Sequence, residues 1–302
     1  MEGAAHHLLA FAWCVLAGFL MSMGGGGGGI LVGVGHISIL GVTDANMIKV
    51  VNQILEFSSR IISVPLYQRQ RRLAWSVALI YGIGAPLGAI CGSWLSESHL
   101  ANMIAYRTWF GVLVTFVAAR VLYEGWAKAA LQRIAHRRAR EASDRVSKQV
   151  RKGGFASIAP EDAPRTVQTT WTKFRIRFGG EHFDFNPWAA GAGGFFISLV
   201  CSLFGVGGGF LVTPFLASVL LFPMYLVVGT SLVALMLPLA ISVITYLALR
   251  VHVDWGLVAS EVPGVVVGSF LGPALNHYFN EKALKTFVAL ILFGTGIYYV
   301  LG

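Results

Sequence analysis

The sequence predicts an all-α polytopic membrane protein with about eight transmembrane segments in two homologous four-segment halves. The first observation behind this is composition: the 302 residues are 56% hydrophobic and 12% charged, whereas soluble domains average about 25% charged. The second is the length of the apolar stretches. Residues 75–95 and 283–301 carry almost no charge and are long enough to cross a hydrocarbon core of about 30 Å as helices.

The third observation is an internal repeat. Shifting the first half by 180 residues brings Gly27–Gly29 onto Gly207–Gly209 and Trp75 onto Trp255 without a gap. Two glycine ladders with four-residue spacing also coincide, at 84/88/92 and 264/268/272. We therefore expect a first transmembrane repeat over 1–124, a linker over 125–187 and a second transmembrane repeat over 188–302.

Each half is expected to contain four hydrophobic segments, of which the first is broken at a glycine motif. In the first half they cover 8–41, 46–66, 73–96 and 101–124, and in the second half 188–221, 223–249, 255–277 and 282–301. Each glycine ladder lines one face of its helix, where small residues let another backbone approach closely. Both ladders therefore predict helix packing.

The linker carries most of the positive charge. Residues 127–187 hold 13 Lys and Arg against 6 Asp and Glu, a net charge of +7, while the rest of the chain has a net charge of +2. We interpret the linker as a cytoplasmic loop beside anionic membrane lipid, and not as a nucleic-acid-binding tract. Within it, 122–152 is compatible with an extension of the fourth helix. The alternation over 174–185 predicts a β-hairpin that pairs Ile176 with Phe183, Phe174 with Phe185 and Arg175 with Asp184.

Orientation follows from the basic residues. The stretch 68–72, "QRQRR", is expected on the cytoplasmic side together with the linker, because two crossings separate them. The broken first segment leaves two topologies open. If it crosses the membrane, the halves are parallel; if it dips in and returns, they are inverted.

The six glycines at 24–29 lie in an apolar segment where they destabilise a helix by roughly 0.5–1 kcal/mol each relative to alanine. Broken backbone at membrane depth is tolerated only where it is buried in protein or lines a watery cavity. Matched breaks in two halves are typical of transporter binding sites, and helices that begin after Gly29 and Gly209 would direct N–H groups at an anion. No Gly-Lys-Ser/Thr follows the glycines, so a nucleotide loop is rejected and no cofactor is expected. Only Gly25 among residues 24–26 has a glycine counterpart, so Gly24 and Gly26 are assigned to local packing.

The motifs "GGGGGGILVGVG" and "GVGGGFLVTP", one in each half, resemble the glycine motifs of the TauE/SafE family of sulfite and organosulfonate exporters. The resemblance covers nearly the whole membrane region. The second motif, with Thr213-Pro214 and "VGTSL" at 228–232, is the closer match, whereas the first has Val34 where the second has Pro214. The resemblance implies export of sulfite, a sulfonate or a similar small anion across the bacterial inner membrane.

Charged residues inside membrane segments are costly and therefore suggest function. Asn52, Glu56 and Arg60 are spaced by four residues and lie on one helix face, where Glu56 and Arg60 can pair. In one interpretation Arg60, or Lys49, attracts the anion and Glu56 carries a coupled proton. In the other, Glu56–Arg60 is a structural ion pair and Lys49 extends to the membrane surface.

Other polar groups complete the candidate site. His36 lies two turns beyond the glycines, while Thr213, Thr230 and Ser231 offer hydroxyls; each of these also has a purely structural interpretation. Glu261 ranks below Glu56, and no metal-ligand cluster is visible. The predicted substrate-binding residues are Gly27, Gly28, Gly29, His36, Asn52, Arg60, Gly207, Gly208, Gly209, Thr213, Thr230 and Ser231, with Glu56 as the candidate for proton coupling.

These features predict a secondary transporter that exports a small sulfur oxyanion or sulfonate. The alternatives are a channel or carrier for another small anion, a non-transporting membrane scaffold that uses the basic loop, and an intramembrane enzyme. The last is disfavoured because Ser231 has no His–Asp partner evident in the sequence. The oligomeric state, the direction of transport and the coupled ion stay open.

Overall fold

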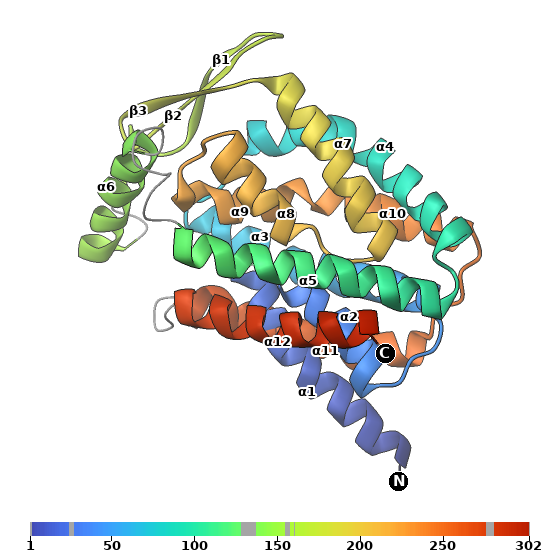
Figure 1. Cartoon of the computed structure of the whole chain (residues 1–302). Helices are drawn as coiled ribbons and strands as arrows, with labels where there is room; N and C mark the ends of the chain where they lie inside the picture. Colours follow the sequence, from blue (N-terminus) through green and yellow to red (C-terminus); the bar gives the residue numbers. More distant parts are fainter. Residues whose placement is uncertain are drawn as a thin grey trace.

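The computed structural model describes residues 2–23, 27–127, 137–154, 158–159, 161–275 and 281–301. Helices dominate these residues, and a small sheet lies in the linker (Figure 1). The helical elements in chain order are α1 (Glu2–Ser22), α2 (Gly28–Val34), η1 (Gly35–Ile39), α3 (Ala45–Arg69), α4 (Trp75–His99), α5 (Met103–Ala127), α6 (Arg137–Gly153), α7 (Pro187–Phe204), α8 (Gly209–Pro214), η3 (Phe215–Val219), α9 (Met224–Ala234), α10 (Met236–Ala248), α11 (Trp255–Leu275) and α12 (Glu281–Leu301). The strands are β1 (Arg165–Thr169), β2 (Phe174–Phe178) and β3 (Glu181–Phe185).

The prediction of an all-α polytopic membrane protein is confirmed. Among the described residues, five helical stretches are long and apolar enough to cross a membrane: Trp75–His99, Met103–Tyr123, Pro187–Phe204, Met224–Ala248 and Trp255–Pro273. The helices on the C-terminal side of the glycine motifs are shorter, at Gly28–Ile39 and Gly209–Val219. At about 1.5 Å per residue they are too short to span the hydrocarbon core.

Two helix boundaries follow from local chemistry. The Asp44 carboxylate accepts hydrogen bonds from the N–H groups of Asn46 and Met47, so it caps the start of α3. The segment expected over 223–249 is divided at Leu235 into α9 and α10. Pro238 has no N–H to donate to the carbonyl of Ala234, and its ring crowds that carbonyl, which explains the division there.

The glycine ladders join helices that are far apart in the sequence. α4 packs most extensively against α7, and α1 against α11. A Cβ atom on Gly88 would lie within 3.0 Å of backbone atoms of Phe195, and one on Gly268 within 3.0 Å of the Val15 carbonyl. The ladder in the first half thus contacts the first helix of the second half, and the ladder in the second half contacts α1. α5 and α12 lie side by side and complete the bundle (Figure 1).

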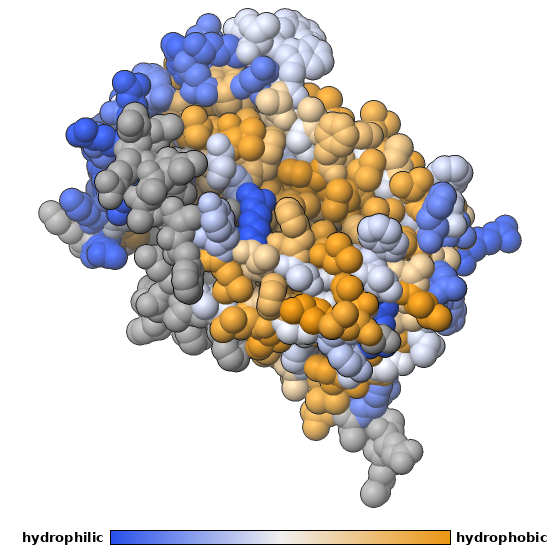
Figure 2. Space-filling model, viewed as in Figure 1, coloured by the Kyte–Doolittle hydropathy of each residue, from blue (hydrophilic) through white to orange (hydrophobic). Residues whose placement is uncertain are grey.

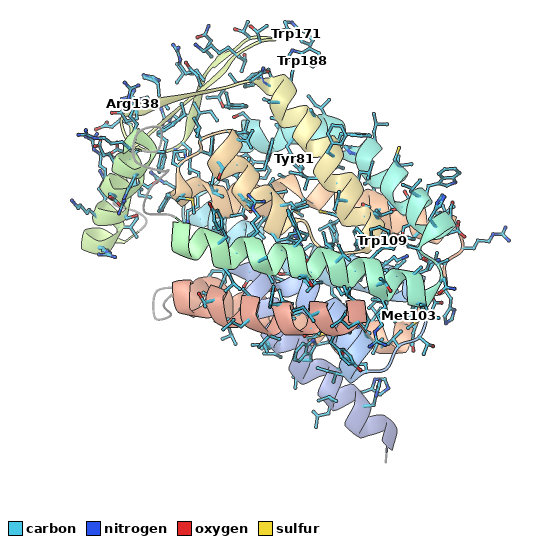
Figure 3. The ribbon with its side chains drawn as sticks, in the orientation of Figure 1. Tyr81, Met103, Trp109, Arg138, Trp171 and Trp188 are labelled. Carbon is cyan, nitrogen blue, oxygen red and sulfur yellow. The ribbon has the colours of Figure 1, made fainter. Side chains whose placement is uncertain are left out.

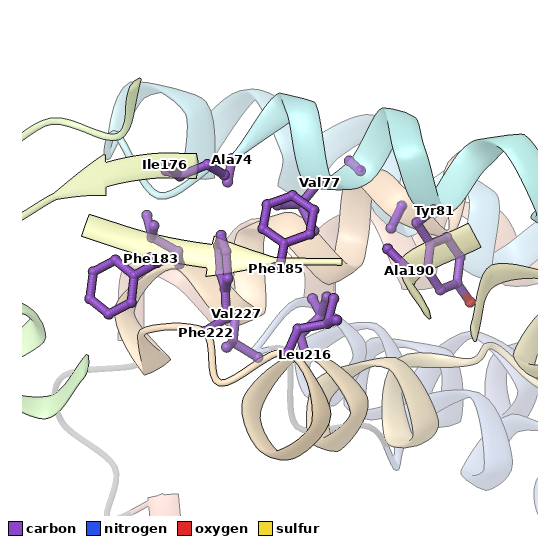
Figure 4. Packing of buried hydrophobic residues seen from close by; sticks show 14 of the residues in the cluster. Ala74, Val77, Tyr81, Ile176, Phe183, Phe185, Ala190, Leu216, Phe222 and Val227 are labelled. Carbon is purple, nitrogen blue, oxygen red and sulfur yellow. The ribbon is translucent and has the colours of Figure 1, made fainter. Parts of the chain in front are cut away.

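The linker forms a small cap that packs on one end of the bundle. β2 and β3 pair antiparallel with Ile176 opposite Phe183, Phe174 opposite Phe185 and Arg175 opposite Asp184, and β1 adds a third strand. Ile176, Phe183 and Phe185 lie in one hydrophobic cluster with residues of α4, α7, η3 and α9 (Figure 4). α5 ends at Ala127 and α6 begins at Arg137. The expected helix extension between them falls partly on 128–136, outside the described residues.

The two ends of the bundle differ. At the cap end, Arg72 lies over the rings of Tyr67 and Tyr225 and donates to the Tyr225 carbonyl. At the other end, Ala10, Leu40 and Leu257 form a cluster where α1, η1 and α11 meet, and both chain termini lie on this side (Figure 1). Figure 2 shows hydrophobic side chains across the middle of the viewed face and hydrophilic ones over the cap and at the opposite end.

Exposed tryptophans mark both ends of this apolar belt. Trp188 begins α7 beside the cap and is 66% exposed, and Trp109 near the other end of α5 is 58% exposed (Figure 3). Tryptophans are enriched at the two membrane–water interfaces. Their positions are therefore those expected of a bundle that crosses the membrane with the cap outside the hydrocarbon region.

Candidate functional site

The first glycine break turns the chain back on itself. α1 ends at Ser22, Gly27 is the N-cap of α2, and α2 continues into the π-helical turn η1. The Trp13 indole donates to the Leu31 carbonyl at 3.0 Å. A Cβ on Gly28 would lie within 3.0 Å of Met21, and one on Gly35 within 3.0 Å of Trp13. α2 and η1 therefore run antiparallel along α1 as a helical hairpin.

The second break has the same form. α7 ends at Phe204, and Gly205 adopts the left-handed conformation (φ 64°) that glycine tolerates at a helix C-terminus. α8 then begins at Gly209 and returns along α7, because Gly193 abuts the Phe215 ring and Gly208 abuts Cys201. The pairs Trp13–Gly35 and Gly193–Phe215 are related by the 180-residue shift. The large residue comes first in one pair and second in the other. Each hairpin thus closes with one large and one small residue.

A polar stripe on α3 faces these hairpins. Asn52, Glu56, Arg60 and Ser63 are all buried. The Arg60 guanidinium donates to the Glu56 carboxylate and, at 2.7 Å, to the Glu56 backbone carbonyl. Both side chains are only 3% exposed. Removing one partner of such a buried pair costs about 3–5 kcal/mol, because the other charge is left without compensation.

The two glycine breaks converge on this ion pair. A Cβ on Gly29 or Gly207 would overlap the Glu56 carboxyl group, and one on Gly29 would also lie 2.9 Å from the Gly207 nitrogen. Only glycine leaves room for the carboxylate between the breaks. The cavity here has a volume of about 10 Å³ and is lined by Met21, Gly28, Gly29, Glu56, Arg60, Gly207, Gly209, Ser231 and Leu232.

A second polar cluster lies one helical turn before Glu56 on α3. His36, in the π-helical turn η1, contacts Asn52 Oδ1 through Nδ1 and Glu261 Oε1 through Nε2, both at 2.8 Å. All three side chains are buried. Asn52 Nδ2 and Glu261 Oε2 have no hydrogen-bond partner among the described residues. The cluster joins three elements, η1, α3 and α11.

The structure brings together seven of the thirteen predicted site residues and separates the rest. Gly28, Gly29, Glu56, Arg60, Gly207, Gly209 and Ser231 line the cavity, whereas His36 and Asn52 belong to the cluster with Glu261. The remaining four do not line the cavity: Gly27 faces Val288 of α12, Gly208 faces Cys201 and Leu235, Thr213 Oγ1 is buried without a partner among the described residues, and Thr230 accepts from the Ala74 N–H.

Two details differ from expectation. α2 begins at Gly28, two residues before the expected start after Gly29, so Gly29 lies within its first turn. Lys49 does not extend to the surface but is buried, donating to the Leu100 carbonyl at 2.7 Å and to Asn46 at 2.9 Å. Gly24 and Gly26, which the sequence assigned to local packing, lie outside the described residues, as does Gly25.

Sequence reasoning missed Met21 and Leu232 in the cavity and ranked Glu261 below Glu56. Leu232 is the counterpart of Asn52 at the 180-residue shift, but its apolar side chain gave no signal of a site. Met21 immediately precedes the first break, where a hairpin inevitably places its side chain near the turn. Glu261 is a buried acid in an apolar helix and carried its own signal. Within the described residues, no group of three His, Cys, Asp or Glu side chains is placed to hold a metal ion.

The chain is similar to known proteins over most of its length. A family model described as "Sulfite exporter TauE/SafE" matches residues 10–299. The chain is also similar to a "probable membrane transporter protein YunE" of Bacillus subtilis (strain 168), with 24% identity over 297 residues that cover 94% of each chain. No solved structure shows a significant match.

Proposed function

Since the chain belongs to the TauE/SafE family of membrane transporters, we propose that it is a secondary transporter that exports a small sulfur-containing anion across the bacterial inner membrane. The anion is sulfite, a sulfonate or a chemical relative. The observation that carries this proposal is the convergence of two glycine breaks, 180 residues apart, on the buried Glu56–Arg60 ion pair. A buried guanidinium beside backbone that has no Cβ atoms in the way suits an oxyanion.

In this proposal the Glu56 carboxylate holds the place of the substrate. It is itself an oxyanion, and it contacts Arg60 and both glycine breaks. The cavity of about 10 Å³ has room for about one water, so a sulfite with four heavy atoms enters only when the carboxylate moves away. The structure therefore corresponds to a closed state, and the anion competes with Glu56 for Arg60.

The hairpins support an inverted arrangement of the two proposed halves, 1–124 and 188–302. Each half then contributes one re-entrant hairpin followed by three crossings, which places its two ends on opposite sides of the membrane. The basic cap of the linker, 125–187, is cytoplasmic in this topology, and the end that holds both termini faces outward. An inside-negative potential favours anion exit by about 2.3 kcal/mol per charge per 100 mV.

The test is flux into and out of proteoliposomes that contain the purified protein. We expect sulfite or a sulfonate to move under an imposed potential and chloride and acetate not to. Gly29→Ala should reduce the flux at least about tenfold, because its Cβ occupies the space of the Glu56 carboxyl group. Gly294→Ala is the matched control, since a Cβ there meets nothing within 4 Å. Absence of selective flux for every sulfur anion in the wild type would refute the proposal.

A further inference from the structure

The cluster of His36, Asn52 and Glu261 is well placed to bind a proton between the outer face and the central site. Asn52 lies seven residues into α3 and Glu261 six residues into α11, which places them about 9–11 Å along these helices from the outer end. Glu56 lies eleven residues into α3, at about 16 Å and near mid-membrane. An exposed hydrogen bond of 3.2 Å between His7 and Ser260, the residue before Glu261, shows that this level of α11 borders the surface.

The hydrogen bonds of the cluster determine how many protons it holds. With Asn52 Oδ1 facing the imidazole, His36 Nδ1 carries hydrogen, because an amide oxygen can only accept. The 2.8 Å contact between Nε2 and Glu261 Oε1 then needs a second proton, held either on the imidazole or on the carboxyl group. A neutral imidazole beside an ionised carboxylate holds only one proton. The observed arrangement therefore holds one more.

Rotation of the Asn52 amide converts one state into the other. With Nδ2 turned toward His36, the amide donates to Nδ1, and Nε2–H donates to the ionised Glu261 carboxylate. Amide oxygen and nitrogen have nearly the same shape, so the exchange needs no change of packing. The cluster can thus release one proton and keep both hydrogen bonds of the imidazole, which an ordinary structural histidine has no need to do.

The titratable groups near the His36–Glu261 pair do not take the proton from it. On α1, the Cys14 thiol lies within hydrogen-bonding reach of Glu261, and His7 lies at the surface. On α3, the Lys49 ammonium is engaged by Asn46 and the Leu100 carbonyl, and Glu56 pairs with Arg60. On α12, the Tyr299 hydroxyl bonds to Ser38. Among the described residues, no other charged side chain forms a hydrogen bond or ion pair with the His36 imidazole.

From this geometry we propose that the His36–Glu261 pair binds the proton that is coupled to transport, taking it up from the outer side. The proposal rests on the proposed function in that the coupled cargo is the anion at Glu56–Arg60. The step is a protonation: a proton from outside water joins the pair, the Asn52 amide turns its oxygen to His36, and the reverse step releases the proton. His36 shares the first hairpin with Gly29, so each change of occupancy acts on an element of the central site.

The test uses full-length protein in liposomes that contain a pH-sensitive dye. The cargo is 2-hydroxyethanesulfonate, whose own charge does not change near neutral pH, so any proton movement belongs to the protein. In the wild type we expect a sulfonate gradient to drive proton flux. Glu261→Gln should keep sulfonate exchange at equilibrium within about twofold and lose proton flux and gradient-driven accumulation by at least about tenfold. Glu97→Gln is the matched control, because Glu97 is a carboxyl on α4 at the same end of the bundle. This variant should behave as the wild type.

An infrared titration of the purified protein without cargo separates the two proposals. We expect a protonated-carboxyl or imidazolium signal that changes with pH in the wild type and disappears in both Glu261→Gln and His36→Gln. The proposal for the proton-binding pair is overturned if Glu261→Gln keeps sulfonate-coupled proton flux at the wild-type ratio. It is also overturned if the wild type lacks this infrared signal. A wild type that shows the signal but transports no sulfur anion refutes the proposed function and leaves the pair standing.

Discussion

Replacing Glu56 by glutamine leaves the Arg60 guanidinium buried without its counter-charge. Both side chains are 3% exposed, so solvent compensates little. Loss of one partner in such a pair costs about 3–5 kcal/mol, and we expect Glu56→Gln to reduce the free energy of unfolding by about this amount. The same unpaired arginine should make the variant a better anion binder than the wild type, because sulfite no longer has to displace the carboxylate.

The size of this gain can be bounded. A tenfold tighter Kd corresponds to about 1.4 kcal/mol, which is less than half of the smallest cost of unpairing Arg60. We therefore expect sulfite to bind Glu56→Gln at least about tenfold more tightly than the wild type. At a concentration of about 100 times Kd, a ligand stabilises the folded state by about 2.7 kcal/mol, so sulfite should restore much of the lost stability.

The assay is thermal unfolding in detergent, with sulfite titrated against chloride at constant ionic strength. The double variant Glu56→Gln/Arg60→Gln is the control, since it has no unpaired charge and should respond to sulfite no more than to chloride. If sulfite stabilises Glu56→Gln no more than it stabilises the wild type, the carboxylate does not hold the place of the substrate. An equal response of the double variant would show that Arg60 is not the contact.

Two further predictions concern the frame around the site. Gly88→Ala should destabilise the protein by about 1–3 kcal/mol, because its Cβ meets the backbone of α7, while Gly82→Ala on the same helix, with no neighbour closer than 3.8 Å, should not; equal thermal stabilities would contradict the ladder's role. Arg175 and Lys173 hold the pKa of Asp184 well below its usual range, so the stability that the Asp184 carboxylate contributes is complete above the unfolded pKa of about 3.9 and is lost as the pH falls below it. The protection factors of the β2 and β3 amides against hydrogen exchange should therefore be constant from about pH 5 upward and lower in Asp184→Asn, and a fall of the protection factors between about pH 5 and 8 would contradict this assignment.

Much of the site was predictable because its parts follow simple periodicities. The four-residue spacing puts Glu56 and Arg60 on one face of α3, and the 180-residue shift identified Gly29 and Gly207 as equivalent positions. The direction of the short helices was not predictable, since a short apolar helix can continue across a membrane or turn back. The contacts of Trp13 with Gly35 and of Gly193 with Phe215 decide this, and they depend on packing between segments.

The partners of single polar residues were the second limit. An acid such as Glu261 in an apolar helix is expected to need a buried polar partner. The residues around it in the sequence do not indicate which helix supplies that partner. Its partner His36 lies 225 residues away. The third strand of the cap was missed for a different reason. All five residues of β1 are exposed, so the strand lacks the apolar alternation by which β2 and β3 were identified.

The crossed packing of the glycine ladders also bears on how the protein is made. α1 leaves the ribosome more than 200 residues before α11, the helix against which it packs most extensively. At about 5–20 residues per second, this delay is on the order of 10–50 s. Throughout that interval α1, and the charged face of α3 behind it, must wait in the bilayer or the translocation channel without their final neighbours. We therefore expect the first half of this transporter to need protection by the bilayer or the translocation channel until synthesis is nearly complete.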